Sequence, residues 1–320
     1  MAYTTFRGMH PFAQFMFSLF VMVVCVLLFM FVSVLIAVPF FGLPEIMRSV
    51  GSTAMDTPES LNFLKYAQVV QSIGLFIVPP FILAWLFYGN MSEYLLIDRS
   101  SSFNNFLYTA LSILLLIPLI NFAGEINSKL TLPASLAGIE DWMRSMEEAA
   151  KVLTEKFLKV DSIPALLFNI FMVGVLPAIG EELLFRGVIQ RIFINWTKSQ
   201  HWGIWIAAIL FSAFHLQFYG FLPRMLLGAM FGYLLVWTGS MWVPMLAHFI
   251  NNTMGVIGYY MMDKAIISKD IEQWGTGSEQ WPLVLFSIVS AGGMLYLIYR
   301  GSDQTKMPAN QIDSQAPRID

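Results

Sequence analysis

The stretch Gly180-Glu181-Glu182-Leu183-Leu184-Phe185-Arg186-Gly187 contains two carboxylates and one guanidinium, inside a run from Ile163 to Trp196 that is otherwise mostly apolar. A charged side chain at the centre of a bilayer costs roughly 2.5–3.5 kcal/mol on insertion scales, so such residues are usually retained for a function. The stretch therefore predicts a membrane-embedded helix with a functional polar centre.

The composition of the whole chain is that of a helical membrane protein. Of its 320 residues, 57% are hydrophobic and 12% are charged, and the mean hydropathy is +0.65. A soluble domain has about twice that charged fraction. Windows of about 18 or more nearly uncharged residues predict an all-α polytopic bundle of about eight transmembrane helices, surrounded by membrane lipid. The net charge of −3 and the lack of a basic stripe exclude nucleic acid as a partner.

The hydrophobic pattern places eight spans along the chain. They cover about residues 11–41, 61–88, 103–122, 163–196, 202–218, 221–237, 241–262 and 282–299. From Ile139 to Phe157, apolar residues recur at three- and four-residue spacing with charged residues on the other face, which predicts an amphipathic helix at the membrane surface. Pro177 and Gly180 are expected to loosen or break the fourth span just before Glu181.

These spans predict four parts of the chain. Residues 1–162 hold the first spans and the amphipathic helix, 163–262 the core with the polar centre, 263–299 a loop and the last span, and 300–320 a polar tail. The basic residues of the loops favour cytoplasmic termini. Short loops without a sorting signal indicate a bacterial inner membrane, with the endoplasmic reticulum as the alternative.

Glu181 and Glu182 are the only acidic residues inside a predicted span. Arg186 follows Glu182 by four residues and therefore lies on the same helix face, so a buried ion pair is expected. This pair could simply fix the bundle or could support a catalytic group. Glu181 points about 100° away from Glu182 and has no partner in its own helix. We therefore expect Glu181 to be a general base.

Two later spans each contribute one histidine. His215 follows Phe211 by one helical turn, and His248 precedes Asn252 by one turn. Imidazoles within apolar helices need polar partners, and convergence with Glu181 satisfies them at the smallest cost. The pattern predicts that Glu181, His215, His248 and Asn252 meet in one water-accessible site.

Such a cluster is compatible with two ways of activating water. In one, Glu181, His215 and His248 ligate a divalent metal such as zinc. In the other, which needs no metal, Glu181 takes a proton from water with help from His215, while His248 and Asn252 stabilise the oxyanion. The sequence leaves both open. It lacks a His-Glu-x-x-His motif, an aspartate in any span and a Gly-x-Ser-x-Gly elbow, which argues against the corresponding zinc, diaspartyl and serine sites.

Three motifs in this order resemble those of the CAAX prenyl proteases and bacteriocin-processing enzymes, the CPBP or Abi family. They are Glu181-Glu182-x-x-x-Arg186-Gly187, Phe211-x-x-x-His215 and His248-x-x-x-Asn252, and the resemblance covers roughly Ile163 to Met254. It implies an intramembrane endopeptidase that acts on a membrane-tethered or lipidated peptide or protein.

Carried over by position, the resemblance makes Glu181 the base and pairs Glu182 with Arg186. It assigns the two family histidines to His215 and His248, and the motif amide to Asn252. Members of the family are often called metalloproteases, and the resemblance does not decide whether this chain needs a metal.

Two other classes of protein remain as alternatives. A proton-coupled transporter could use Glu181, His215 and His248 as a relay, and dependence of uptake on a proton gradient would identify it. A non-catalytic membrane scaffold would keep its cellular role after Glu181→Ala. Haem ligation by the two histidines is a third reading, which a colourless purified protein would dismiss.

Overall fold

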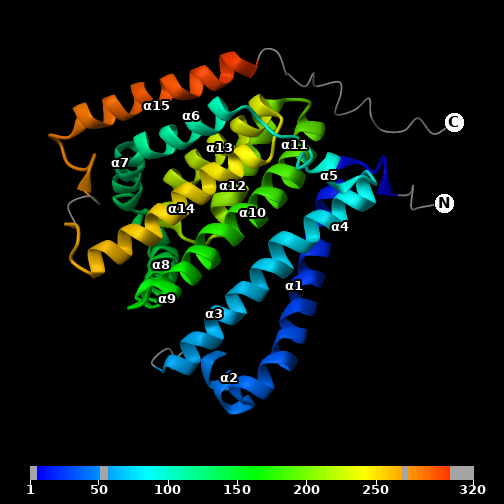
Figure 1. Cartoon of the computed structure of the whole chain (residues 1–320), viewed down its shortest axis with the longest axis vertical. Coiled ribbons are helices and arrows are strands. Elements are labelled where there is room, and N and C mark those ends of the chain that lie inside the picture. Colours follow the sequence, from blue (N-terminus) through cyan, green and yellow to red (C-terminus); the bar gives the residue numbers. More distant parts are fainter. Residues whose placement is uncertain (1–5, 51–56, 269–272, 303–320) are drawn as a thin grey trace.

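The computed structural model describes residues 6–50, 57–268 and 273–302, and over these residues every regular element is a helix (Figure 1). The all-helical class predicted from the sequence is therefore confirmed. The helices follow the chain as an N-terminal pair, a central bundle that contains the polar stretch, and an outer layer.

The N-terminal pair consists of two long helices that run side by side (Figure 1). The first is α1 (Pro11–Phe41), which the short α2 (Leu43–Val50) follows. The second is continuous and consists of α3 (Pro58–Ser72), the π-helical η2 (Ile73–Ile77) and α4 (Val78–Phe87). The wider turn of η2 immediately precedes Pro79 and Pro80, which have no N–H for the regular helical hydrogen bond.

The polar stretch lies in one continuous helix, residues 163–197, which we call the motif helix. It consists of α9 (Ile163–Asn169), η4 (Ile170–Val175), α10 (Leu176–Glu182), η5 (Leu183–Ile189) and α11 (Gln190–Thr197). Ser162 caps its start by accepting a hydrogen bond from the backbone N–H of Ala165, 3.3 Å away. The expected disturbance near Pro177 is a widened π-helical turn, η4, which ends two residues before the proline and keeps the chain helical. A second π-helical segment, η5, follows Glu182.

Three helices pack around the motif helix and complete the central bundle. They are α12 (Gln200–Phe214), α13 (Phe221–Thr238) and α14 (Trp242–Asp263), and the short 3₁₀ turn η6 (Phe218–Gly220) precedes α13. The helix α14 lies against η4 and α10, whereas α12 packs against α11 and α13. This arrangement brings the helix carrying Glu181 between the segments that carry His215 and His248.

The outer layer consists of the remaining helices. They are α5 (Met91–Tyr94), α6 (Phe103–Leu115), α7 (Ile117–Ser128), η3 (Ala134–Leu136), α8 (Ala137–Leu158) and α15 (Trp281–Gly301). The helices α6 and α7 form one bent pair with an angle of 46°, and α15 packs against both. The bent pair and α15 together cover α13 (Figure 1).

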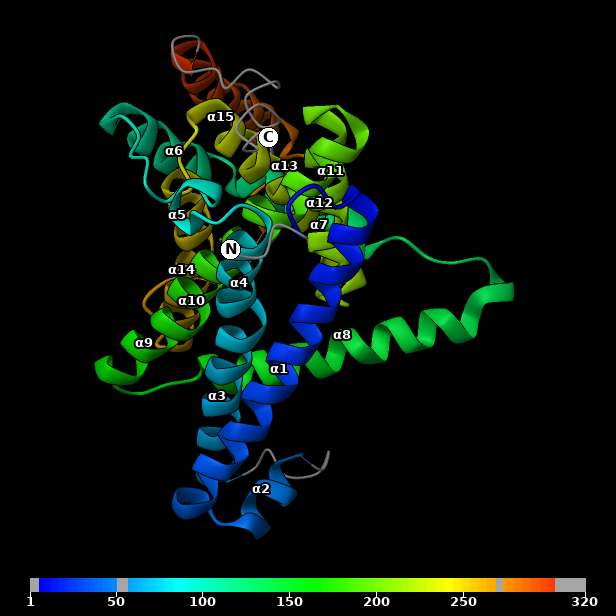
Figure 2. The ribbon, with the colours of Figure 1, turned by 90° about the vertical axis from the view of Figure 1, so that its right-hand side faces the viewer.

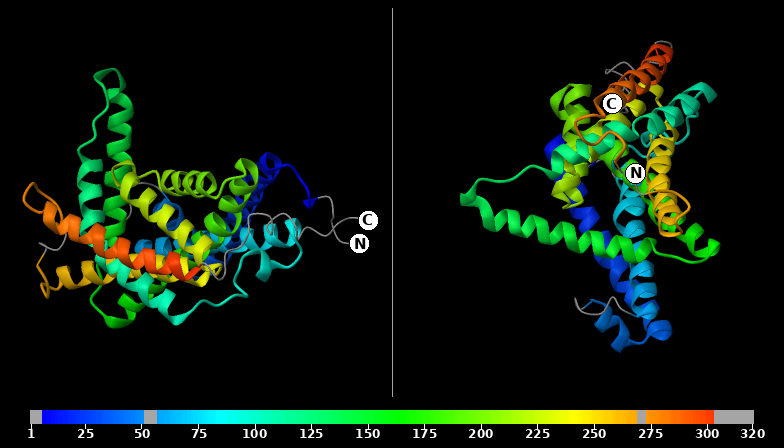
Figure 3. Two further views of the ribbon diagram at one scale, coloured as in Figure 1. Left: turned by 90° about the horizontal axis from the view of Figure 1, so that it is seen from above. Right: turned by 90° about the vertical axis from the view of Figure 1, so that its left-hand side faces the viewer.

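The amphipathic helix α8 projects from the bundle and runs across the direction of α1 and α3 (Figures 2 and 3). Its C-terminal end is held in place by a buried polar chain. Lys65 Nζ donates to Asn169 Oδ1 at 3.0 Å, and Asn169 Nδ2 donates to the Phe157 carbonyl at 2.8 Å. Because Lys65 and Asn169 are buried, these bonds fix the last turn of α8 to α3 and α9.

By length and composition, five helices of the described residues can cross a bilayer, or six if the bent pair is one span, against the eight that the sequence predicts. The difference comes from the fifth and seventh expected spans. The helix α12 has only 15 residues. The helix α14 has 22 residues, but His248, Asn251 and Asn252 lower its hydropathy. The three polar side chains of α14 line the cavity, which explains its lower hydropathy, whereas α12 is apolar but short.

Gly180 allows the motif helix to approach the N-terminal pair closely. A Cβ atom at this position would lie 2.7 Å from Phe76 Cβ and 3.2 Å from the backbone carbonyl carbon of Phe76. Contacts this short force one of the two helices to move. The glycine before the two glutamates therefore sets the distance between η2 and the helix that carries them.

Gly180→Ala is expected to destabilise the protein by about 1–3 kcal/mol, because the methyl group overpacks a helix contact. Gly255→Ala is the matched control, since a Cβ at Gly255 meets no heavy atom within 4 Å. The control should be neutral or stabilising, by up to about 1 kcal/mol, because alanine favours a helix. Unfolding of both variants in detergent measures the difference, and equal stabilities would show that the Gly180 contact adjusts freely.

Candidate active site

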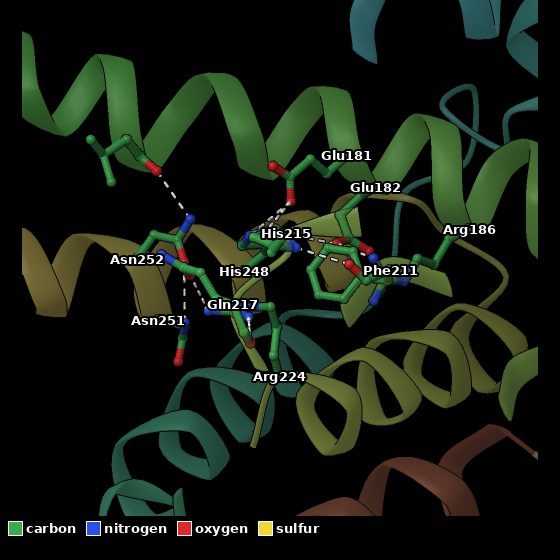
Figure 4. A network of polar contacts seen from close by, with 11 residues as sticks. Glu181, Glu182, Arg186, Phe211, His215, Gln217, Arg224, His248, Asn251 and Asn252 are labelled. Carbon is green, nitrogen blue, oxygen red and sulfur yellow. Dashed lines mark hydrogen bonds and ion pairs between the residues drawn. The ribbon is translucent and has the colours of Figure 1, made fainter. Parts of the chain in front are cut away.

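Glu181 lies between the two histidines. Its Oε2 atom is 3.8 Å from His248 Nε2 and 4.0 Å from His215 Nε2 (Figure 4). The Glu181 side chain is nearly buried, with 8% of the residue exposed. Both separations exceed a direct hydrogen bond and are short enough for one water molecule to bridge the groups. The structure thus brings together three of the side chains that the sequence singles out.

His215 is oriented by the end of its own helix. It caps α12, and its Nδ1 lies 2.9 Å from the Phe211 carbonyl, one of the carbonyls that a helix end leaves without a backbone partner. A carbonyl only accepts, so Nδ1 carries the proton and Nε2 of the neutral ring is left as an acceptor. The Phe211 ring also packs edge-on against the imidazole, with centroids 5.1 Å apart. Both contacts explain the four-residue spacing of Phe211 and His215.

His248 is oriented by Glu182 rather than by its own helix. Its Nδ1 donates to Glu182 Oε1 at 2.8 Å, and the same oxygen accepts from Arg186 Nη1 at 2.8 Å. Glu182 is fully buried, and His248 is 4% exposed. The carboxylate fixes the imidazole through its Nδ1 atom and turns its Nε2 atom towards Glu181, as carboxylates orient the ring in many histidine sites. The Nε2 atoms of both histidines therefore face Glu181.

Arg186 closes this buried network. Besides its ion pair with Glu182, its Nη2 donates to the Gly228 carbonyl at 3.0 Å. The guanidinium lies 4.4 Å from the Phe211 ring centroid and 5.3 Å from that of Phe231. A Cβ at Gly228 would come within 3.3 Å of Arg186 Nη2, so the glycine leaves room for this contact. The predicted Glu182–Arg186 pair is present, and residues of α12, α13 and α14 contact it.

Phe231 and the Gly228 carbonyl are site groups that the sequence reasoning missed. The Phe231 ring stacks on the His248 imidazole with centroids 5.3 Å apart. One turn beyond Gly228, the Gly232 carbonyl accepts from Gln190 Nε2 at 3.3 Å. In the sequence, the four-residue step from Arg186 to Gln190 matches the step from Gly228 to Gly232, which was a signal that both glycine carbonyls are bonded.

Asn252 contacts the backbone of the motif helix. Its Nδ2 donates to the Val173 carbonyl at 3.0 Å, and its Oδ1 accepts from Asn251 Nδ2 at 3.1 Å. Val173 precedes Pro177 by four residues, so the proline lacks the N–H that would bond this carbonyl in a regular α-helix. Asn252 thus repairs the helix at its proline and uses only one of its two N–H groups for this bond.

The site opens into a cavity of about 460 Å³. Glu181, His215, His248 and Asn252 all line it, and the last turns of α8 contribute Leu153, Thr154, Phe157 and Leu158. The buried bonds that hold Phe157 therefore also fix one wall of the cavity. Two further polar residues of the lining, Gln217 and Arg224, were not predicted. A cation in the first turn of an otherwise apolar span was the signal for Arg224.

The donor types of Glu181, His215 and His248 suit zinc, because two imidazoles and a carboxylate are common zinc ligands. Over the described ranges, however, no group of three or more His, Cys, Asp or Glu side chains is arranged to hold a metal ion. As placed, these three residues do not form a metal site. Chelation is the direct test of the metal-dependent alternative.

The helical spans and the buried polar centre define an integral membrane protein. Residues 163–254 match the model of one family, described as type II CAAX prenyl endopeptidase Rce1-like. The resemblance that the sequence shows is therefore confirmed over this segment of the chain.

Two curated relatives are similar to part of the chain. The uncharacterized protein YpbD of Bacillus subtilis (strain 168) is 32% identical over 102 residues, which are 31% of this chain and 47% of the relative. An uncharacterized 24.3 kDa protein of Escherichia coli is 27% identical over 116 residues, 34% of this chain and 52% of the relative. The chain thus spans about half the length of the curated relatives it matches. No solved structure matches.

Proposed function

We propose that the chain is an intramembrane endopeptidase that hydrolyses peptide bonds of membrane-associated proteins or peptides, with Glu181 as the general base. One observation supports this function above all. The Oε2 atom of a nearly buried carboxylate faces two imidazole Nε2 atoms at 3.8 and 4.0 Å, in a cavity large enough for a peptide segment.

In the proposed reaction, a water molecule between Glu181 and the histidines attacks the carbonyl carbon of the scissile bond. Glu181 takes one proton of this water, with the His215 Nε2 acceptor holding the other, and later passes its proton to the leaving amine. The tetrahedral intermediate carries a negative oxygen. Protonated His248 and the remaining N–H of Asn252 donate to this oxyanion. No atom beyond water and the peptide is consumed.

Glu182 and Arg186 are positioning residues in this scheme. The Glu182 carboxylate holds His248 in one orientation and stabilises its protonated form, as the buried aspartate does in a serine-protease triad. Arg186 keeps the Glu182 carboxylate in place, since the two share a 2.8 Å contact. The ion pair is therefore assigned a supporting role in catalysis as well as a structural one.

The proposed substrate is a membrane-tethered or lipidated peptide or protein. The match of residues 163–254 to a family described as type II CAAX prenyl endopeptidase Rce1-like supports this substrate class. We also propose that the chain lies in a bacterial inner membrane with cytoplasmic termini, in addition to the glutamate-based chemistry and the substrate class.

Cleavage of a library of membrane-tethered peptides by the purified full chain tests this function. Wild type and Glu181→Gln are compared, each with and without a chelator. Loss of cleavage with the substitution alone supports the metal-free scheme, and loss with both supports a metal. If wild type cleaves no member of the library while it accumulates a solute under a proton gradient, the transporter reading replaces the peptidase.

Asn252→Ala is expected to lower kcat by about 10²–10³, the usual loss for an oxyanion donor. It also leaves the Val173 carbonyl without its partner, which should destabilise the protein by about 1–3 kcal/mol. Asn251→Ala is the matched control, because Asn251 also lines the cavity but bonds only to Asn252 among the described residues. Steady-state kinetics of both variants, measured well below their unfolding temperatures, separate the two effects. Equal kcat values for the two would remove Asn252 from the catalytic step.

A further inference from the structure

Arg224 brings a positive charge into the same cavity as Glu181. It lies in the first turn of α13, and Figure 4 shows it beside Gln217. Both residues line the 460 Å³ cavity together with Glu181, His215 and His248. The mechanism proposed above makes no use of Arg224, so its presence in an apolar helix calls for another explanation.

Gln217, a neutral residue, is the hydrogen-bond partner of the Arg224 guanidinium. Arg224 Nη2 donates to Gln217 Oε1 at 2.6 Å, and Nη1 lies 3.4 Å from the Gln217 carbonyl. Over the described residues, no carboxylate oxygen comes within ion-pair distance of Arg224, whereas Arg186 is paired with Glu182 and Lys264 with Asp161. A guanidinium has five N–H donors, and Gln217 engages only some of them.

Gln217 and Gly220 hold the guanidinium at one place in the cavity. Both belong to the connection between α12 and α13, which also follows His215 directly. A Cβ at Gly220 would lie 3.0 Å from Arg224 Nη2, so the glycine leaves space for the cation. The fork of donors is thus positioned in advance, which lowers the entropy lost when an anion binds.

We propose that Arg224 is a specificity-determining residue that binds a carboxylate of the substrate peptide. This inference rests on the proposed peptidase function. A guanidinium binds carboxylates in a two-point geometry, and the pairing is strong where water is excluded. The carboxylate is either the C-terminus of the substrate or an acidic side chain close to the scissile bond. The substrate class is therefore a peptide with a negative charge on the side of the site where Arg224 lies.

Binding of three lipid-anchored peptide libraries distinguishes these sources. The first has a free C-terminal carboxylate and no acidic residue, the second has a C-terminal amide and no acidic residue, and the third has a C-terminal amide with Asp and Glu at the variable positions. Each is titrated against the detergent-solubilised full chain carrying Glu181→Gln, with and without Arg224→Gln. Binding by the first library identifies the chain terminus, and binding by the third identifies an acidic side chain.

Arg224→Gln is expected to raise Kd for the preferred carboxylate library about 10- to 100-fold, the usual effect of losing a charged hydrogen-bond pair. Kd for the library with neither charge should stay within about twofold. Arg224→Lys should keep part of the preference, since it keeps the charge and loses the fork. Lys129→Gln, which removes an exposed cation at the C-terminal cap of α7, is the control for net charge.

Equal effects of Arg224→Gln on all libraries, or no binding preference for a carboxylate in the parent protein, would overturn the proposal. Unfolding temperature and elution volume of each variant identify a folding defect, and in that case Arg224→Lys decides the outcome. Cleavage by the wild-type chain is measured in parallel. If the chain prefers a carboxylate but cleaves no peptide, the peptidase function is refuted and the anion site stands. If the chain cleaves peptides without this preference, the anion site is refuted and the peptidase function stands.

Discussion

Replacing Glu181 with glutamine is expected to lower kcat about 10²–10⁴-fold and to leave the fold intact. The amide has nearly the shape of the carboxylate but does not accept the proton of the attacking water. Glu181 makes no direct hydrogen bond to either histidine, because the closest approaches are 3.8 and 4.0 Å. Its loss therefore removes no buried bond of the described network, and the unfolding temperature should change little. Single-turnover cleavage of a tethered peptide measures the effect.

Two further variants make this result specific. Glu181→Asp keeps the base but withdraws it by one methylene group, so it should retain more activity than Glu181→Gln. Glu148→Gln removes an exposed carboxylate of α8 and should leave the rate unchanged. A Glu181→Gln protein with more than about a tenth of wild-type activity would contradict the assignment of Glu181 as the base.

Replacing Arg186 with methionine is expected to destabilise the protein by about 3–5 kcal/mol. The substitution leaves the Glu182 carboxylate buried without its cation, which is the costly way to break a buried ion pair. It also removes the bond to the Gly228 carbonyl and the contact with the Phe211 ring. His248 would lose its fixed orientation as Glu182 shifts, so activity should fall together with stability.

The double variant Glu182→Gln/Arg186→Met separates the charge from the packing. Removing both charges should recover part of the lost stability, because no uncompensated ion remains in the bundle. The exposed pair Glu125–Lys129 is the matched control, and Lys129→Met should cost at most about 1 kcal/mol. Unfolding in detergent compares all three. If the double variant is no more stable than Arg186→Met, the buried charge of Glu182 is not the cause of the loss.

The sequence alone was sufficient for those features that follow from a single helix. Four-residue spacing places Arg186 over Glu182, and the structure contains this pair. The same spacing places Phe211 one turn before His215, where its carbonyl and ring both contact the imidazole. Bilayer energetics identified the polar stretch, because charged residues in an apolar span are expensive and therefore rare.

Contacts between helices could not be read from these spacings. The sequence suggested that His248 turns to Glu181, and its Nε2 atom does face that carboxylate, but the sequence did not reveal its hydrogen bond to Glu182. It also did not reveal that Asn252 bonds to the Val173 carbonyl before Pro177. Arg224 belongs to the cavity only because the connection after α12 folds back towards the site. The count of spans also depended on tertiary structure, since α12 ends after 15 residues and polar side chains that line the cavity lower the hydropathy of α14.

The amino-acid sequence by itself determined that this protein is a helical membrane protein and which side chains could carry chemistry, because hydrophobicity and helical periodicity are local properties of the chain. Only the tertiary structure decided which residues contact each glutamate, which nitrogen of each histidine faces Glu181, and where in the cavity the Arg224 cation lies. The physical reason is that these outcomes depend on distances between helices. Those distances are set by side-chain packing, as at Gly180 and Gly228, and not by the spacing of residues within one helix.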